Sequence, residues 1–214
     1  MDWRIRRTPR NMHHWTRRCA TRILACLVLG VASTAQGPVI SEIMARNATT
    51  LRDPKEFNLE DWIEIHNPTA GQLSLTGWFL TDDALNLTKW KFPSRSIPAG
   101  GYEIVYASGR NVRISGQPAH TNFELNGDGE FLALVHKDGT TIESVFAPSF
   151  PKQYPDLAFG RSNNTGVLGY FETPTPGAAN PSNAFVVVAG KVTSTRPRGR
   201  YSVPFSTTLA SPTP

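Results

Sequence analysis

Short runs in which apolar and polar residues alternate are the dominant pattern of this chain. They are densest between residues 61 and 93, where Ile63 and Ile65 flank Glu64 and each run stops at a Pro, Gly or Asn. Alternation with a period of two places successive side chains on opposite faces of a β-strand. Short runs bounded by turn residues are typical of half-buried antiparallel strands. The pattern therefore predicts strands with Ile63 and Ile65 on the core side.

A break in the alternation predicts a bend in the middle of this stretch. Leu75 lies at an odd position, whereas Trp78 and Leu80 lie at even positions, so one unbroken strand cannot bury all three on one face. We therefore expect a bulge or a tight turn at Thr76-Gly77.

Strand-like runs continue along the chain, about eight of them between residues 39 and 161, with no amphipathic helix among them. Asn126-Gly127-Asp128-Gly129 and Asp138-Gly139 are the clearest hairpin signals. Such a pattern predicts an all-β fold, an antiparallel β-sandwich. We expect the core of this sandwich to contain Ile63, Ile65, Leu75, Trp78, Leu80, Trp90, Phe92, Ile104, Leu132 and Leu134.

The first 35 residues have the layout of a signal peptide. An Arg-rich start precedes an apolar run over residues 23–35, and Ser33 and Ala35 are small residues of the kind that signal peptidase requires. We expect a signal-peptide helix with cleavage after Ala35, and hence a secreted protein in the extracellular space or the periplasm. An uncleaved anchor is the alternative, although the run is shorter than the ~20 residues that span a bilayer. Both cysteines, Cys19 and Cys26, would leave with the leader.

The charge is divided unevenly along the chain. The formal net charge is +5 and the pI is about 9.5, but seven of the 22 basic residues are Arg in the first 35 positions. Between residues 38 and 180 there are 11 basic and 16 acidic residues. A nucleic-acid partner is therefore not expected for this part, because binding to phosphates depends on clustered cations.

Composition divides the chain into four parts. After the signal peptide (1–35) comes the sandwich (36–162), and residues 163–184 are rich in Pro, Gly and Asn, which is typical of a linker. Residues 185–214 resume with strand character but are too few to build a core of their own. We expect them to be an incomplete second module or a disordered tail.

Candidate chemistry is sparse. If the strand over residues 62–66 lay beside the strand over residues 78–83, Glu64, Asp82 and Asp83 could hold a calcium ion, since carboxylates are the ligands that calcium prefers. The alternative is that these acids cap turns. Ser41 and Ser108 lack the context of a hydrolase nucleophile, and the histidines lack the spacing of a metal motif. We therefore predict no catalytic residues, no enzyme activity and, calcium apart, no cofactor.

The tryptophans offer a second possible site. Trp62, Trp78 and Trp90 could form an aromatic platform for a saccharide. The parity of Trp78 and Trp90 with Leu80 and Phe92 instead favours packing in the core.

Eight segments, in order, carry a resemblance to a known family: VISEIMARN, DWIEIHNP, LTGWFLTDD, KWKFP, GYEIVYASG, HTNFELNGDGEFLALV, KDGT and LAFGR. Over residues 38–162 the chain resembles the bacterial form of the lamin tail domain. The resemblance implies an immunoglobulin-like β-sandwich without catalytic apparatus. It also implies a secreted bacterial protein in which the domain serves binding or interaction.

A shorter resemblance lies near the C-terminus. The sequence RGRYSVPFSTTL, from Arg198 to Leu209, resembles the opening of a chitobiase C-terminal-type Ig-like module. We expect a non-catalytic module for attachment or interaction, with a protein, cell-surface or polysaccharide partner, and with membrane contact only through the signal peptide. The alternative is a targeting module of a larger secreted enzyme, a hydrolase or CotH-kinase-like protein, whose catalytic domain lies beyond residue 214.

Overall fold

The computed structural model describes residues 37–190 and 192–211, and no residue in these ranges lies in a helix. The predicted signal-peptide helix and its cleavage site at Ala35 lie outside the described residues. Within the described ranges no helix is long and apolar enough to cross a membrane. The strands are β1 (Val39–Met44), β2 (Trp62–His66), β3 (Leu73–Ser74), β4 (Phe79–Thr81), β5 (Trp90–Lys91), β6 (Ser96–Ile97), β7 (Tyr102–Tyr106), β8 (Ala119–His120), β9 (Leu132–Val135), β10 (Ile142–Phe146), β11 (Ala158–Arg161), β12 (Leu168–Phe171), β13 (Thr193–Ser194) and β14 (Leu209–Ala210).

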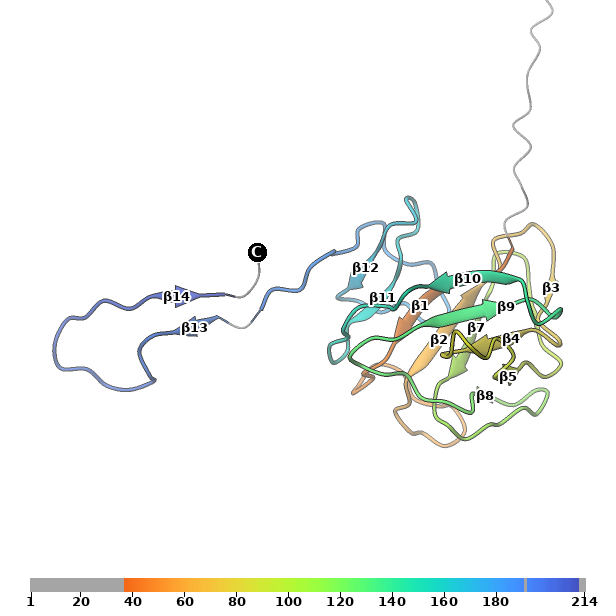
Figure 1. Cartoon of the computed structure of the whole chain (residues 1–214), viewed down its shortest axis with the longest axis horizontal. Coiled ribbons are helices and arrows are strands. Elements are labelled where there is room, and N and C mark those ends of the chain that lie inside the picture. The colour runs from red at the N-terminus through yellow and green to blue at the C-terminus, as the bar shows by residue number, and fades with distance from the viewer. Residues whose placement is uncertain (1–36, 191, 212–214) are drawn as a thin grey trace, which may run out of the picture. The chain divides into compact units, whose positions relative to one another are not determined.

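Two sheets form the body of the domain. The larger has the strand order β12-β11-β1-β2-β7-β8, the smaller has the order β10-β9-β4-β5, and β3 pairs with β6 in a short ribbon. Strands β9 and β10 pack over β1 (Figure 1). The prediction of an all-β fold with antiparallel sheets is confirmed, and the arrangement is consistent with an immunoglobulin-like sandwich. One pair departs from it, because β7 and β8 run parallel. The long connection over residues 107–118 makes this parallel pairing possible.

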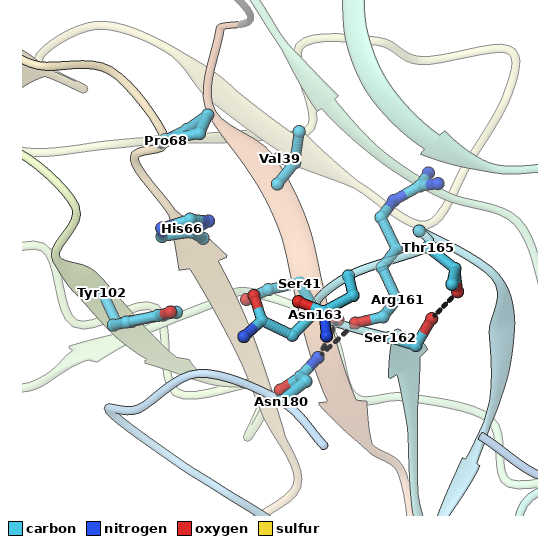
Figure 2. A pocket seen from close by; sticks show the side chains of 12 residues that line it. Val39, Ser41, His66, Pro68, Tyr102, Arg161, Ser162, Asn163, Thr165 and Asn180 are labelled. Carbon is cyan, nitrogen blue, oxygen red and sulfur yellow. Dashed lines mark hydrogen bonds between the residues drawn. The ribbon is translucent and has the colours of Figure 1, made fainter. Parts of the chain in front are cut away.

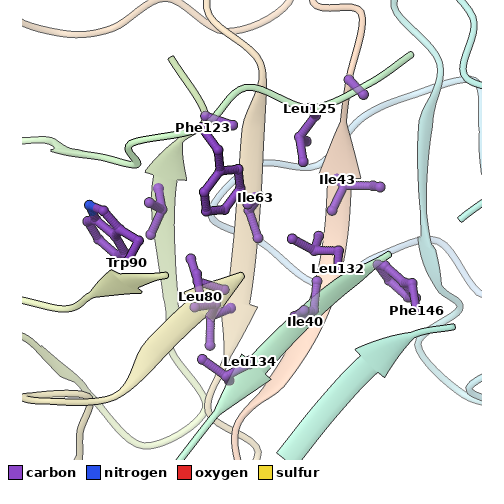
Figure 3. Packing of buried hydrophobic residues seen from close by; sticks show 14 of the residues in the cluster. Ile40, Ile43, Ile63, Leu80, Trp90, Phe123, Leu125, Leu132, Leu134 and Phe146 are labelled. Carbon is purple, nitrogen blue, oxygen red and sulfur yellow. The ribbon is translucent and has the colours of Figure 1, made fainter. Parts of the chain in front are cut away.

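The main core lies between the two sheets (Figure 3). All of the predicted core residues except Ile104 belong to it. Ile104 is only half-buried and packs against a second cluster of Met44, Trp62, Tyr106, Ala158 and Phe171. The register explains the error, because Ile104 pairs with Glu64 and shares its outward-facing row rather than that of Ile63.

The predicted bend at Thr76-Gly77 is present and carries the chain from one sheet to another. The Trp78 N–H donates to the Leu75 carbonyl oxygen at 2.9 Å, and Gly77 has a φ of 83°. A turn with positive φ at its third residue favours glycine there. Because the chain changes sheets at this turn, Leu75 and Trp78 both reach the core despite their opposite parity.

Residues 163–184 complete the sandwich and are not a linker, which corrects the prediction from composition. Strand β12 pairs with β11 along its whole length, and Tyr170 exchanges two backbone hydrogen bonds with Phe185. Tyr170 and Phe171 are buried. The three prolines of this segment and Gly177 lie after β12, where side chains of the sheet satisfy the irregular backbone.

The C-terminal part contains only a short two-stranded ladder. Thr193 pairs with Ala210 and Ser194 with Leu209. Every described residue from 192 to 211 is exposed, so this segment forms no buried core.

Candidate functional site

The outer face of the six-stranded sheet, which is the face turned away from the four-stranded sheet, carries the polar groups of interest. The register of β1 and β2 pairs Met44 with Trp62, Glu42 with Glu64, and Val39 with His66. Pairs on one face lie in successive rows along the strands. The outer face therefore has an apolar row, an acidic row and an aromatic row.

A β-bulge in β1 separates the acidic row from the aromatic row. The register shifts between Ile40 and Glu42, so Ser41 is the extra residue. Its hydroxyl donates to a carboxylate oxygen of Glu64 at 2.6 Å. Gly160 on the neighbouring strand β11 faces the bulge, and a Cβ added there would lie 2.2 Å from the Ser41 carbonyl oxygen. The sheet can therefore close around the bulge because residue 160 has no side chain.

The two glutamates of the acidic row are completely buried. They are covered by residues 172–181, which we call the strap. The Thr175 N–H donates to both carboxylate oxygens of Glu42 at 3.2 Å, and the Gly177 N–H donates to Glu64 at 2.6 Å. Asn180 fixes the end of the strap, since its amide donates to the Ser41 and Arg161 carbonyl oxygens at 2.9 Å each. The strap is thus held by the acids that it covers.

Burial dominates the electrostatics of the acidic row. It raises the pKa of Glu42 to about 8, helped by the adjacent Glu64 and opposed by the hydrogen bonds from Thr175. Burial likewise raises the pKa of Glu64 to about 7, against the hydrogen bonds from Ser41 and Gly177. A carboxyl in low dielectric beside a second carboxyl retains its proton, because two neighbouring buried charges are unfavourable. The row therefore holds bound protons near neutral pH.

The structure separates the acids that the sequence suggested as a calcium site. Glu64 lies on β2, whose neighbours are β1 and β7, whereas Asp82 follows β4 of the other sheet. Asp82 pairs with Lys89 at 2.6 Å, and Asp83 accepts a hydrogen bond from the Leu85 N–H at 2.8 Å. Among the described residues no group of three or more His, Cys, Asp or Glu could hold a metal ion. The two strands are not neighbours, so the condition for this calcium site is not met, and Asp83 has the alternative role of a turn cap.

A pocket of about 420 Å³ opens on the outer face at the aromatic row (Figure 2). Cavities of ~300–1,000 Å³ are of the size that binds small ligands. One wall comes from β1, β2 and β7, and the opposite wall is the turn after β11. The lining residues are Val39, Ser41, His66, Pro68, Tyr102, Arg161, Ser162, Asn163, Asn164, Thr165, Gly166 and Asn180.

The rings of His66 and Tyr102 form the flat wall of the pocket. They are paired in register across β2 and β7 and stack with centroids 4.5 Å apart and planes 14° apart. Burial lowers the pKa of His66, and burial together with the nearby Glu64 raises the pKa of Tyr102. Both shifts favour the neutral form, so this wall carries no charge at neutral pH.

The opposite wall is a turn fixed by its own hydrogen bonds. The Gly166 N–H donates to the Ser162 carbonyl oxygen at 2.9 Å, and the hydroxyls of Ser162 and Thr165 are 2.5 Å apart. Arg161 directs its guanidinium away from the two rings, towards the Val145 carbonyl oxygen (Figure 2). The turn therefore presents amide and hydroxyl groups to the pocket.

A second polar cluster lies at the other end of the domain. The Ser108 hydroxyl is 3.0 Å from His120 Nδ1, and His120 Nε2 is 3.2 Å from Asp53. This order of groups is that of a Ser-His-Asp hydrolase site. Sequence inspection could not find it, because the three residues lie in separate segments.

The position of Arg110 argues for a structural role of this cluster. Its Nη2 atom is 2.9 Å from His120 Nδ1 and 2.8 Å from Asp53. In a hydrolase, the histidine takes the proton from its serine and passes it to a leaving group. Here the Arg110 guanidinium occupies the space beside the His120 ring that this transfer would need. Burial and the Arg110 charge also lower the pKa of His120, which opposes formation of the imidazolium. We interpret the cluster as the anchor of the loop that contains Asp53, whose side chain is fully buried.

Sequence inspection did not identify the residues of the pocket. His66 and Tyr102 are 36 positions apart, and only the pairing of β2 with β7 places them together. The turn at residues 161–166 was divided between the predicted domain and the predicted linker. The tryptophans proposed as a platform are buried and cannot serve as one. The alternation of apolar and polar residues does not distinguish residues that line a pocket from residues that pack in the core.

The sequence also matches a family model. The model described as the lamin tail domain matches residues 32–148, which is more than half of the chain. The chain belongs to the lamin tail domain family. No curated protein matches it.

The match divides the pocket of this lamin tail domain into two parts. The wall formed by Val39, His66 and Tyr102 lies within the matched residues, whereas the turn at 161–166 and Asn180 lie after them. The fold nevertheless continues beyond residue 148, since β11 and β12 extend the same sheet as β1. The pocket therefore combines a wall within the family match with a turn from the following segment.

Proposed function

We propose that this protein is a secreted, non-catalytic lamin tail domain that attaches to the bacterial cell envelope or to extracellular material by binding a surface ligand. The observation that carries the proposal is the pocket on the outer face of the six-stranded sheet. Its walls are held by backbone pairing and by the hydrogen bonds of the turn, so little has to be ordered on binding. The family membership agrees with a binding role.

Co-sedimentation with isolated cell envelopes tests this function. The purified protein, from residue 36 onward, is incubated with envelopes of the producing bacterium over a range of concentrations. We expect saturable co-sedimentation, and we expect it to persist at high salt because the pocket is lined mainly by neutral groups. Binding that is absent, or that rises without saturation, would contradict the proposal.

A narrower role is that of a targeting module in a larger secreted enzyme. It is favoured by the resemblance of the segment from Arg198 to Leu209 to the opening of a chitobiase C-terminal-type Ig-like module. Sequencing the reading frame beyond Pro214 tests this role. A continuous frame that encodes a hydrolase or a CotH-kinase-like domain would support it, and an immediate stop codon would contradict it.

A further inference from the structure

The pocket offers an aromatic surface of the kind that receives the apolar face of a ring. The stacked His66 and Tyr102 rings are both only half-buried. Tyr has an apolar ring face and a polar tip, which suits a ligand that is itself apolar on one face and polar at its edge. A pyranose ring has this character, because its C–H groups lie on its faces and its hydroxyls at its rim.

The remaining lining groups fit a ligand with many hydroxyls. Amide and hydroxyl side chains donate and accept hydrogen bonds at once, as sugar hydroxyls do. Within the described part of the chain, no hydrogen bond occupies the Tyr102 hydroxyl or the side-chain amide of Asn163. Asn163 is exposed and is directed into the pocket from the rigid turn (Figure 2). These groups are free to bind a ligand without breaking existing contacts.

The charge of the site argues against an anionic ligand. No acidic residue lines the pocket, and its one permanent cation, Arg161, is engaged elsewhere, with its guanidinium 5.6 Å from the centre of the Phe146 ring. A phosphate or nucleic-acid ligand would need cations that point at it. Between residues 38 and 180 the acidic residues outnumber the basic ones, 16 to 11, which opposes polyanions further.

From these observations we propose that the pocket binds a neutral pyranose unit of a surface polysaccharide. The sugar ring packs on the His66–Tyr102 wall, and its hydroxyls bond to Asn163 and to the Tyr102 hydroxyl. This inference rests on the proposed attachment function and names its ligand class. It also assigns a role to the turn at 161–166, which lies outside the residues that match the family model.

Affinity electrophoresis in native gels tests the proposal. The protein, from residue 36 onward, is run in gels that contain laminarin, galactomannan or arabinoxylan, with dextran sulfate as the charged comparison. We expect retardation by at least one of the neutral polysaccharides and none by dextran sulfate. Retardation by dextran sulfate alone, or by no polysaccharide, would overturn the proposal.

Two substitutions locate the binding in the pocket. Asn163→Ala removes one amide and should weaken the binding about fivefold, the effect of one neutral hydrogen bond. Tyr102→Ala removes the ring and should weaken it about tenfold or more, whereas Tyr102→Phe keeps the ring and should resemble Asn163→Ala. Gln72→Ala, an exposed amide outside the pocket, is the matched control and should bind as the wild type does.

The variants also separate the two proposals from each other. Thermal melting is measured for each, and Asn163→Ala remains informative if Tyr102→Ala unfolds, because residue 163 is exposed on a turn. If Asn163→Ala and Tyr102→Phe keep full affinity for the polysaccharide, the pocket assignment is overturned. If the wild-type protein still binds envelopes in that case, the attachment function stands. Loss of envelope binding in the wild type would overturn the attachment function itself.

Discussion

Glu42 and Glu64 are the residues whose chemistry depends most on their surroundings. Each is an ordinary strand residue in the sequence, yet the register of β1 and β2 places them directly opposite each other and the strap covers both. Buried carboxyls that lie side by side favour protonation, because ionising both would place two charges in a medium of low dielectric. Their titration should therefore be visible in the stability of the whole domain.

We predict that the free energy of unfolding decreases as the pH rises from about 5 to 9. The folded-state pKa values of Glu42 and Glu64, about 8 and about 7, lie above the ordinary value of 4.5. The contribution of these groups is thus complete below pH 4.5 and is lost as the pH rises through 7 and 8. Each carboxyl that keeps its proton only in the folded state contributes a slope of about 1.4 kcal/mol per pH unit. Urea unfolding at a series of pH values measures this slope.

Glu42→Gln should make the slope shallower. The amide cannot ionise or repel Glu64, and its oxygen can still accept the hydrogen bond from the Thr175 N–H. Glu143→Gln, at an exposed position of β10, is the control and should leave the slope unchanged. Equal slopes for the wild type and Glu42→Gln would show that the pair does not control the pH dependence.

The strap and β12 are the elements that composition misassigned. Three prolines, one glycine and one asparagine make up half of residues 172–181, a content typical of a flexible linker. The N–H groups of Thr175 and Gly177 instead donate to Glu42 and Glu64, and β12 extends the large sheet beyond β11. The strap has few internal hydrogen bonds, such as that from the Ala178 N–H to the Thr175 carbonyl oxygen, and it is ordered because side chains elsewhere satisfy its backbone.

Truncation distinguishes the domain boundary predicted from the sequence, after Ser162, from the boundary that the structure indicates, which lies beyond β12. A chain that ends after Ser162, the boundary predicted from the sequence, loses Tyr170 and Phe171 and exposes both glutamates. Losing a buried aromatic side chain costs about 3–5 kcal/mol, so two such losses approach the whole stability of a typical domain, ~5–15 kcal/mol. We expect this chain to be unfolded by circular dichroism. A chain that ends after residue 190 should melt as the full protein does, and a cooperative melt of the shorter chain would contradict this boundary.

At the scale of the whole molecule, the domain has two distinct faces. The inner face of the large sheet is apolar and closes the core, whereas the outer face has the acidic row, the strap and the pocket. A surface site on a rigid scaffold suits a domain that attaches to something outside the cell. Export is then required for the proposed function.

We predict that the exported protein begins at Gln36. The apolar run over residues 23–35 and the small residues Ser33 and Ala35 favour cleavage after Ala35. Mass spectrometry of the protein from the periplasm or the culture medium measures the N-terminus. Replacing Ala35 with Arg, a residue too large for the peptidase, should leave the precursor uncleaved, whereas Gln36→Asn should not. An intact precursor of the wild type in the membrane fraction would indicate an anchor.

Much of the fold followed from local pattern. Alternation identified most of the longer strands, although not β12, and most of their buried residues, and the parity break located the turn at Thr76-Gly77, because both are properties of neighbouring residues. The site did not follow from local pattern. Ile104 was misassigned, and the sequence left open whether Glu64 lies near Asp82 and Asp83, since both questions concern which strands become neighbours.

By itself, then, the sequence determined the fold class, the core of the sandwich and the resemblance to the lamin tail domain. These depend on the period of two along each strand and on short motifs, which are local. Only the tertiary structure decided that Glu42 faces Glu64, that His66 stacks on Tyr102 and that residues 172–181 cover the acids. Each of these contacts joins segments far apart in the chain. Their chemistry arises from strand order, register and burial, which alternation leaves open.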